Sequence, residues 1–181
     1  MKRLIPAIVA LIPALWFTGC VSIPRGAVAE NDFQSEKYLG KWYEIARFDF
    51  TFEKNLDNTT AEYAILENGY ISVTNRGYNY KTQKWQQAEG KARFRGSDTV
   101  AELEVSFFGP FYAGYNVISL DNDYRYALVA GSSTEFLWIL SRTRDLPPEI
   151  RDKYISLAKS LGYETENLIW VEHNKQSVPP G

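Results

Sequence analysis

Apolar and polar residues alternate along most of the chain in short runs, a pattern typical of β-strands with one buried and one solvated face. Between Val100 and Phe108, residues 101, 103, 105 and 107 are all apolar, whereas the intervening residues are Glu or Ser. Segments rich in Gly, Asn, Asp and Ser separate the runs and are short enough for hairpins. The pattern predicts an antiparallel all-β domain with eight strands, at Lys41–Phe52, Thr59–Leu66, Tyr70–Tyr78, Trp85–Arg95, Val100–Phe108, Tyr115–Leu120, Tyr124–Ala130 and Phe136–Thr143.

A helical pattern follows the strands. Pro147 and Pro148 stand at its start, Gly162 follows its end, and apolar residues at helical spacing form one stripe between them. Such a stripe must pack against another part of the protein. Eight up-and-down strands can close into a barrel that has no exposed edges, and the outer wall of the barrel can bury the stripe. We therefore expect an eight-stranded up-and-down antiparallel β-barrel with one C-terminal helix packed outside and a short final strand at Asn167–His173.

The first twenty residues have a different character. Two basic residues precede an uncharged apolar run, and Cys20, the only cysteine, follows Gly19. This is typical of a secretory signal, because a membrane-spanning helix needs about 20 apolar residues. Residues 17–20 also resemble the bacterial lipoprotein box, which is cleaved before a cysteine that then receives acyl chains. The resemblance implies a signal peptide at residues 1–19, a lipidated Cys20 and, from Val21, sorting to the outer membrane.

The remaining chain divides into a linker and one domain. Residues 20–33 show no periodicity and contain Pro24 and Gly26, so we expect a flexible linker with a reach of roughly 40 Å. Residues 34–181 then form the barrel domain. Without the two basic residues of the leader, 18 Lys and Arg stand against 22 Asp and Glu, a balance that argues against nucleic acid as a partner.

Three sequence blocks resemble those of the lipocalin family. They are Gly40-Lys41-Trp42-Tyr43, Asp123-Tyr124 and Arg142, and their order and spacing also fit. Residues 37–48 and 105–112 are similar to the bacterial outer-membrane lipocalins, relatives of apolipoprotein D. The resemblance covers essentially the whole mature chain and implies a lipocalin calyx that binds lipid.

Chain direction places the first and third blocks together. If Trp42 starts the first strand at the closed end, eight alternating strands return Arg142 to the same end. A guanidinium group there can stack on the indole ring and donate to nearby carbonyl groups. We therefore assign Gly40, Trp42 and Arg142 to closure of the fold rather than to ligand contact.

Strand parity predicts which side chains line the calyx. With Trp42 and Arg142 inward, the lining is uncharged and includes small residues that leave an open apolar cavity. The same parity points Glu44 inward, where it pairs with Arg142 unless a β-bulge turns it to solvent. The expected ligand-lining residues are Ala46, Phe48, Ala61, Tyr63, Ile71, Val73, Ala92, Phe94, Leu103, Val105, Phe107, Tyr115, Val117, Tyr126, Leu128, Phe136, Trp138 and Leu140.

The loops at the open end are rich in aromatic residues. Loops at such a mouth normally face water, so this much apolar surface indicates a contact made by the rim. Four interpretations are open: a gate for lipid, a contact with the membrane, a homodimer interface, or rings that fold inward as lids. The rim residues are Phe50, Phe52, Tyr78, Phe108, Phe111 and Tyr112.

A narrow, uncharged calyx suits one long apolar chain whose polar head stays at the mouth. Fatty acids and lysophospholipids fit that description, and lipid binding is also what the resemblance implies. We therefore expect a protein anchored in the outer membrane, with its barrel in the periplasm, that stores or transports such lipids for envelope maintenance. The alternatives are a lipocalin-fold enzyme that acts on a lipid and a structural envelope lipoprotein with a filled barrel.

Little in the sequence supports catalysis. His173 is the only histidine and lies outside the eight strands, where we expect it to face solvent. The chain has no Gly-x-Ser-x-Gly motif and no clustered metal ligands. We therefore expect no enzymatic activity, no catalytic residues, no metal and no cofactor.

Overall fold

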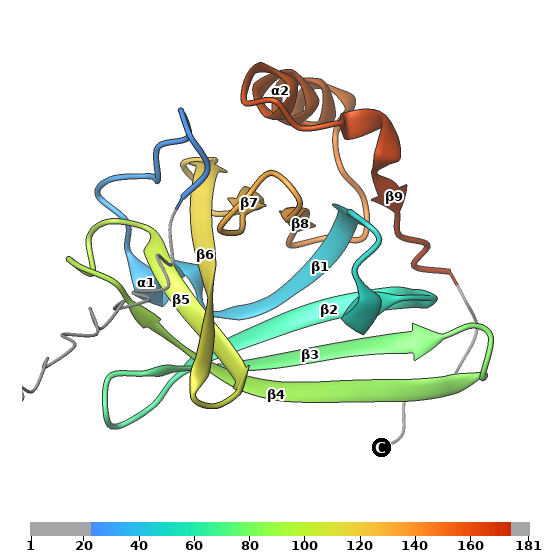
Figure 1. Cartoon of the computed structure of the whole chain (residues 1–181), viewed down its shortest axis with the longest axis horizontal. Helices are drawn as coiled ribbons and strands as arrows, with labels where there is room; N and C mark the ends of the chain where they lie inside the picture. The colour runs from blue at the N-terminus through green and yellow to red at the C-terminus, as the bar shows by residue number, and fades with distance from the viewer. Residues whose placement is uncertain (1–22, 175–181) are drawn as a thin grey trace, which may run out of the picture.

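The structure, a computed structural model, describes residues 23–174. Nine strands form a single antiparallel sheet (Figure 1), in which neighbours from β1 to β8 are consecutive in sequence. Because β1 pairs with both β2 and β8, the first eight strands close into a barrel, and β9 pairs with β1 on the outside. The strands are β1 (Gly40–Arg47), β2 (Leu56–Ile65), β3 (Ile71–Asn79), β4 (Lys84–Phe94), β5 (Glu102–Phe108), β6 (Phe111–Leu120), β7 (Tyr126–Ala130), β8 (Leu137–Ser141) and β9 (Ile169–Trp170).

The eight-stranded barrel is therefore confirmed, although strand boundaries shift, by up to three residues in most strands and by more at the end of the first and the start of the sixth. The first strand does not extend to Phe52 but ends at Arg47, after which the chain turns into the short 3-10 helix η1 (Thr51–Glu53). The Arg47 guanidinium holds this turn by donating to the Glu53 backbone carbonyl at 2.7 Å. The sixth strand begins at Phe111 rather than Tyr115, because it pairs with β5 up to a tight hairpin at residues 109–110.

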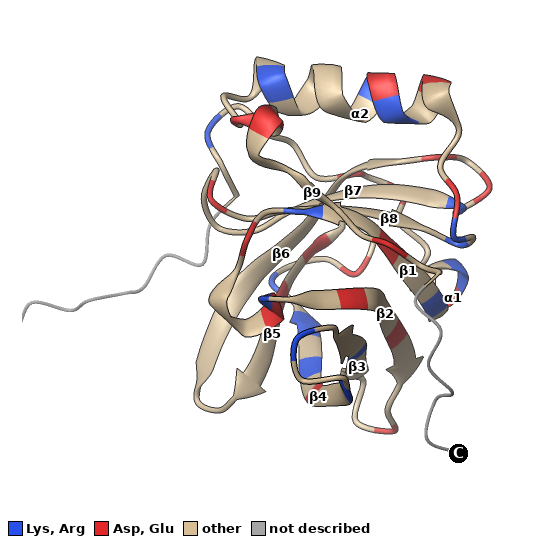
Figure 2. Cartoon of the chain, turned by 90° about the vertical axis from the view of Figure 1, so that its right-hand side faces the viewer, with Lys and Arg blue, Asp and Glu red and all other residues tan. Residues whose placement is uncertain are grey.

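One helix covers the outside of the barrel, as predicted. Helix α2 (Pro148–Ser160) lies across one wall, and Lys, Arg, Asp and Glu residues are distributed along it (Figure 2). Tyr154 and Ala158 are buried in a cluster with residues from β1, β6, β7 and β8, while the rest of the apolar stripe packs around them. Burial of each large apolar side chain contributes about 1.5–3 kcal/mol, so this second core fixes the helix on the wall.

The segment before the barrel is not a free linker from residue 20 to residue 33. The Glu30 amide donates to the Val117 carbonyl at 2.9 Å, and the Glu30 carbonyl accepts from the Ala101 amide at 2.9 Å. Phe33 is buried in the core at the closed end, beside the short helix α1 (Ser35–Tyr38). Residues 23–33 are thus part of the fold, because they pair with backbone groups of Ala101, just before β5, and of Val117 in β6. Only residues 20–22 of the expected linker lie outside the described part of the chain.

Candidate functional site

The closed end is built around Trp42 and Arg142. The Arg142 guanidinium lies 3.9 Å from the centre of the Trp42 ring and donates to the carbonyl groups of Lys37, Lys41 and Tyr124. The Trp42 indole N–H donates to the Tyr38 carbonyl at 2.8 Å. Gly40 has a φ of 87°, a conformation that other L-residues rarely adopt. The three residues assigned to fold closure therefore meet at one end of the barrel.

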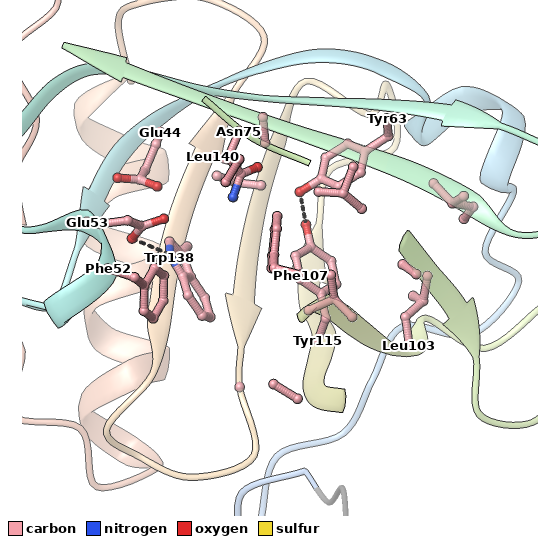
Figure 3. Close-up of a pocket in the computed structure, with 18 of the residues that line it drawn as sticks. Glu44, Phe52, Glu53, Tyr63, Asn75, Leu103, Phe107, Tyr115, Trp138 and Leu140 are labelled. Carbon is pink, nitrogen blue, oxygen red and sulfur yellow. Dashed lines mark hydrogen bonds between the residues drawn. The ribbon is translucent and has the colours of Figure 1, made fainter. Parts of the chain in front are cut away.

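A cavity of about 510 Å³ occupies the rest of the barrel and opens at the other end. Its wall is mostly apolar and comes from every barrel strand except β7, together with α1 and η1. Figure 3 shows part of this wall, with Leu103, Phe107 and Leu140 among its apolar side chains. The structure places twelve of the predicted lining residues in the wall: Ala61, Tyr63, Ile71, Val73, Ala92, Leu103, Val105, Phe107, Tyr115, Phe136, Trp138 and Leu140.

Two predicted lining residues, Ala46 on β1 and Phe48 directly after it, instead face the core beneath α2. The cause is a bulge in β1: Glu44 pairs with Leu140, but Ala46, two positions later, pairs with Ile139, the adjacent residue of β8. One extra residue reverses the side to which all following side chains point. Glu44 therefore stays inward, Ala46 and Phe48 turn outward, and the expected partner of Glu44, Arg142, lies elsewhere.

The two residues predicted from β7 are also misplaced. Tyr126 and Leu128 belong to the core beneath α2, whereas Ala127 and Val129 face the barrel interior. Because the helix buries the outer face of β7, both faces of this strand are apolar, and hydrophobic alternation cannot distinguish them. The remaining two, Phe94 and Val117, face the interior but pack in the filled core rather than in the cavity wall.

The expectation of an uncharged lining is wrong, because Glu44 and Glu53 both lie in the cavity wall. Arg47 connects them: its Nε lies 3.4 Å from a Glu44 oxygen and 3.5 Å from a Glu53 oxygen. Thr59 donates a hydrogen bond to Glu44, and the Trp138 indole N–H donates to Glu53. Sequence parity had placed Glu44 correctly, but Glu53 enters the barrel only because the loop after β1 folds inward.

Burial changes the protonation of both carboxyl groups. It raises the pKa of Glu53 to about 7, although the positive charge of Arg47 and the hydrogen bond from Trp138 oppose the change. Burial, together with the adjacent Glu53 carboxyl, raises the pKa of Glu44 well above its usual range. Near neutral pH this pair therefore holds a proton that two exposed carboxyl groups would have lost.

Three tyrosines form the floor of the cavity. The Tyr115 hydroxyl lies 2.7 Å from the Tyr38 hydroxyl and 2.8 Å from the Tyr63 hydroxyl, so hydrogen bonds link all three. Burial raises the pKa of each phenol, which keeps the hydroxyls protonated. The strand pattern predicted Tyr63 and Tyr115 but missed Tyr38, because it precedes the first strand on α1.

The six predicted rim residues divide into two groups. Phe52, Phe108 and Phe111 are 61%, 81% and 78% exposed, and all three border the cavity. Tyr112 also borders it and is covered by the Arg93 guanidinium, 4.6 Å from the ring centre.

The other two rim residues pack within the protein. Phe50 is buried against the Phe136 and Trp138 rings, and Tyr78 packs on Trp85. Phe50 therefore folds inward without bordering the cavity, whereas Phe108 and Phe111 of the β5–β6 hairpin are exposed.

Histidine does not contribute to the cavity wall within the described residues. His173 is half-buried rather than solvent-facing, because its Nε2 lies 2.8 Å from the Glu44 carbonyl outside the cavity, and burial lowers its pKa. Within residues 23–174, no three His, Cys, Asp or Glu side chains are grouped as metal ligands would be. None of the helices in that range is long and apolar enough to cross a bilayer.

The sequence profile of the Lipocalin-like domain family matches residues 33–173, which is most of the chain. The protein is a lipocalin. This lipocalin is 47% identical over 172 residues to outer membrane lipoprotein Blc of Escherichia coli K12, covering 94% of the chain and 97% of that protein. It is 35% identical over 154 residues to mouse apolipoprotein D, covering 80% and 79% of the two chains.

A comparison of folds agrees with the family assignment. Insecticyanin from the tobacco hornworm Manduca sexta superimposes with a TM-score of 0.66 at 21% identity, covering 85% of this lipocalin and 88% of the insecticyanin chain. The resemblance to outer-membrane lipocalins and to apolipoprotein D that the sequence blocks indicated is thus confirmed.

Proposed function

We propose that this lipocalin binds one long apolar chain, that of a fatty acid or a lysophospholipid, and stores or transports it for the upkeep of the cell envelope. The observation that carries the proposal is the open cavity of about 510 Å³ with a mainly apolar wall. Each methylene group that moves from water into such a wall contributes up to about 0.8 kcal/mol. Binding is then a reversible partition, and no bond of the lipid changes.

We further propose that the protein is held in the outer membrane by acyl chains on Cys20, with the barrel in the periplasm. Cys20 and the signal peptide proposed at residues 1–19 lie outside the described residues. The lipoprotein-box motif supports this location, as do the relatives named outer membrane lipoprotein in Escherichia coli and Vibrio cholerae. Ile23 packs against the core beneath α2, so only residues 21 and 22 stand between the proposed anchor and the fold in the sequence.

Native mass spectrometry of residues 21–181, produced in bacteria and purified without detergent, tests the binding. We expect one intact lipid per chain, and the same spectrum reports whether two copies associate through the exposed rim. A ligand-free protein that takes up neither fatty acid nor lysophospholipid would contradict the proposal and favour a purely structural role. Release of a cleaved product from an added lysophospholipid would instead reveal an enzyme.

A further inference from the structure

Two buried carboxyl groups in the cavity wall share one guanidinium group. Glu44 and Glu53 both contact the Nε atom of Arg47, whose side chain is 2% exposed. Arg47 is fixed by the backbone, because its Nη2 donates to the carbonyl groups of Glu53 and Leu56 at 2.7 and 3.0 Å. In Figure 3, Glu44 and Glu53 lie one beside the other, next to Trp138. Among the described residues, no other Lys or Arg forms an ion pair with either carboxyl group.

Each carboxyl group uses only one oxygen for these contacts. Thr59 and Arg47 approach Oε1 of Glu44, while Trp138 and Arg47 approach Oε2 of Glu53. Within residues 23–174, nothing donates to Glu44 Oε2 or Glu53 Oε1, although the two residues are only 6% and 7% exposed. The fully buried atoms of the cluster without a hydrogen-bond partner are Nε and Nη1 of Arg47, whereas these two oxygens keep accessible surface where Glu44 and Glu53 line the cavity. The cavity therefore offers two acceptors to the molecule that occupies it.

The charges of the cluster are unequal. Two carboxylates and one guanidinium leave one negative charge, and a low-polarity cavity makes an unbalanced charge costly. In the free protein a proton balances it, because burial raises the pKa of Glu53 to about 7 although the positive charge of Arg47 opposes the rise. A ligand that brings its own positive charge can take the place of that proton.

We propose that Glu44 and Glu53 bind the ammonium group of an amphiphile whose apolar chain fills the cavity. An ammonium group has three donors, enough for both free carboxylate oxygens, and it neutralises the cluster. A carboxylate head in the same place cannot donate a hydrogen bond, and the negative charges of Glu44 and Glu53 repel it. The inference rests on the proposed function and narrows it to lipids with an amino head. The ammonium could come from an alkylamine or from the ethanolamine head of a lysophospholipid.

Competition between matched ligands tests this selectivity. The full chain in phosphatidylcholine nanodiscs is loaded with the apolar dye N-phenyl-1-naphthylamine, and empty discs correct for partition into lipid. Dodecylamine, dodecanol and dodecanoate carry the same alkyl chain and differ in the head. At pH 8 we expect dodecylamine to displace the dye at about tenfold lower concentration than dodecanol, and dodecanoate at about tenfold higher. At pH 5.5 the advantage of the amine falls about tenfold, because Glu53 is protonated.

Two single variants and a control connect the selectivity to the acid pair. Glu53→Gln and Glu44→Gln keep the side-chain shape and remove one charge, so the preference for dodecylamine over dodecanol should fall about tenfold in each. Asp49→Asn removes the same charge from an exposed position in the same loop and should leave the preference unchanged. Dye binding shows that each variant retains its cavity. The same competition with lysophosphatidylethanolamine and lysophosphatidylglycerol of equal chain length tests whether the head group of a phospholipid can supply the ammonium group as an alkylamine does.

The outcomes separate this inference from the proposed function. Equal displacement by dodecylamine, dodecanol and dodecanoate in the unaltered protein would overturn the ammonium site while leaving lipid binding intact. An amine preference that survives in both glutamine variants would also overturn it. A protein that does not bind the dye, and for which no ligand competes, would instead contradict the proposed function itself.

Discussion

At the closed end of the barrel, hydrogen bonds within the protein pair the polar groups of Trp42, Arg142 and the three floor tyrosines. None of these groups therefore needs a ligand as its hydrogen-bond partner. The open half differs in three ways. It is hollow, it exposes phenylalanines, and it buries two carboxyl groups against a single Arg47. The difference indicates that one end carries the stability of the barrel and the other carries the binding.

Removal of the closed-end ring should have the largest effect on stability. Trp42→Ala deletes a fully buried side chain and the surface on which Arg142 stacks, so it should cost about 3–5 kcal/mol in the free energy of unfolding. Urea denaturation measures the loss. Trp170→Ala, at a partly exposed position on β9, is the control and should cost less than about 1 kcal/mol. Similar losses in the two variants would contradict the division between the ends.

The open half should make stability depend on pH. The Glu53 pKa rises from 4.5 to about 7 on folding, so the native state binds the proton more tightly than the unfolded state. The resulting stabilisation, about 3 kcal/mol, is fully present below pH 4.5 and is lost as the pH rises through 7. Urea denaturation at pH 5 and pH 8 should show this loss, and Glu53→Gln should remove most of it. A Glu53→Gln protein with unchanged pH dependence would show that other groups cause it.

Inner and outer walls should respond differently to added volume. Ala92→Phe projects into the cavity and should weaken lipid affinity by about tenfold or more, with little loss of stability. Ala46→Phe overfills the core beneath α2 and should cost about 1–3 kcal/mol while lipid affinity stays the same. Titration with lipid and urea denaturation measure the two effects. If Ala46→Phe weakened lipid affinity and left stability unchanged, Ala46 would face the cavity and β1 would lack the bulge.

The exposed hairpin should matter least for stability. Phe108→Ser with Phe111→Ser removes two rings that are mostly solvent-exposed, so the free energy of unfolding should change by less than about 0.5 kcal/mol. Lipid uptake from vesicles, or association of two chains in analytical ultracentrifugation, should nevertheless decline. If both stay unchanged, the rim has no role in binding.

Sequence patterns predicted the barrel well because most strands bury one face only, as β2 shows, where Thr59, Ala61 and Tyr63 are buried and the residues between them are more exposed. They failed where that condition breaks. In β7 the helix buries the second face, and in β1 a single extra residue after Glu44 reverses the parity for Ala46 and Phe48. Neither the bulge nor the inward fold of Glu53 leaves a local signal, because both depend on packing between distant segments. The sequence therefore predicted the cavity and most of its apolar wall, but not the pair of buried carboxyl groups.

The position of the bound chain is the most direct test of the account. Trp138 lies in the cavity wall, whereas Trp42 is buried at the closed end. A fatty acid brominated in mid-chain quenches tryptophan fluorescence only at short range, so the difference between the original protein and Trp138→Phe isolates quenching at the wall. We predict that binding quenches the Trp138 contribution at one lipid per chain. Quenching that is the same with and without Trp138 would place the lipid outside the cavity and contradict the account.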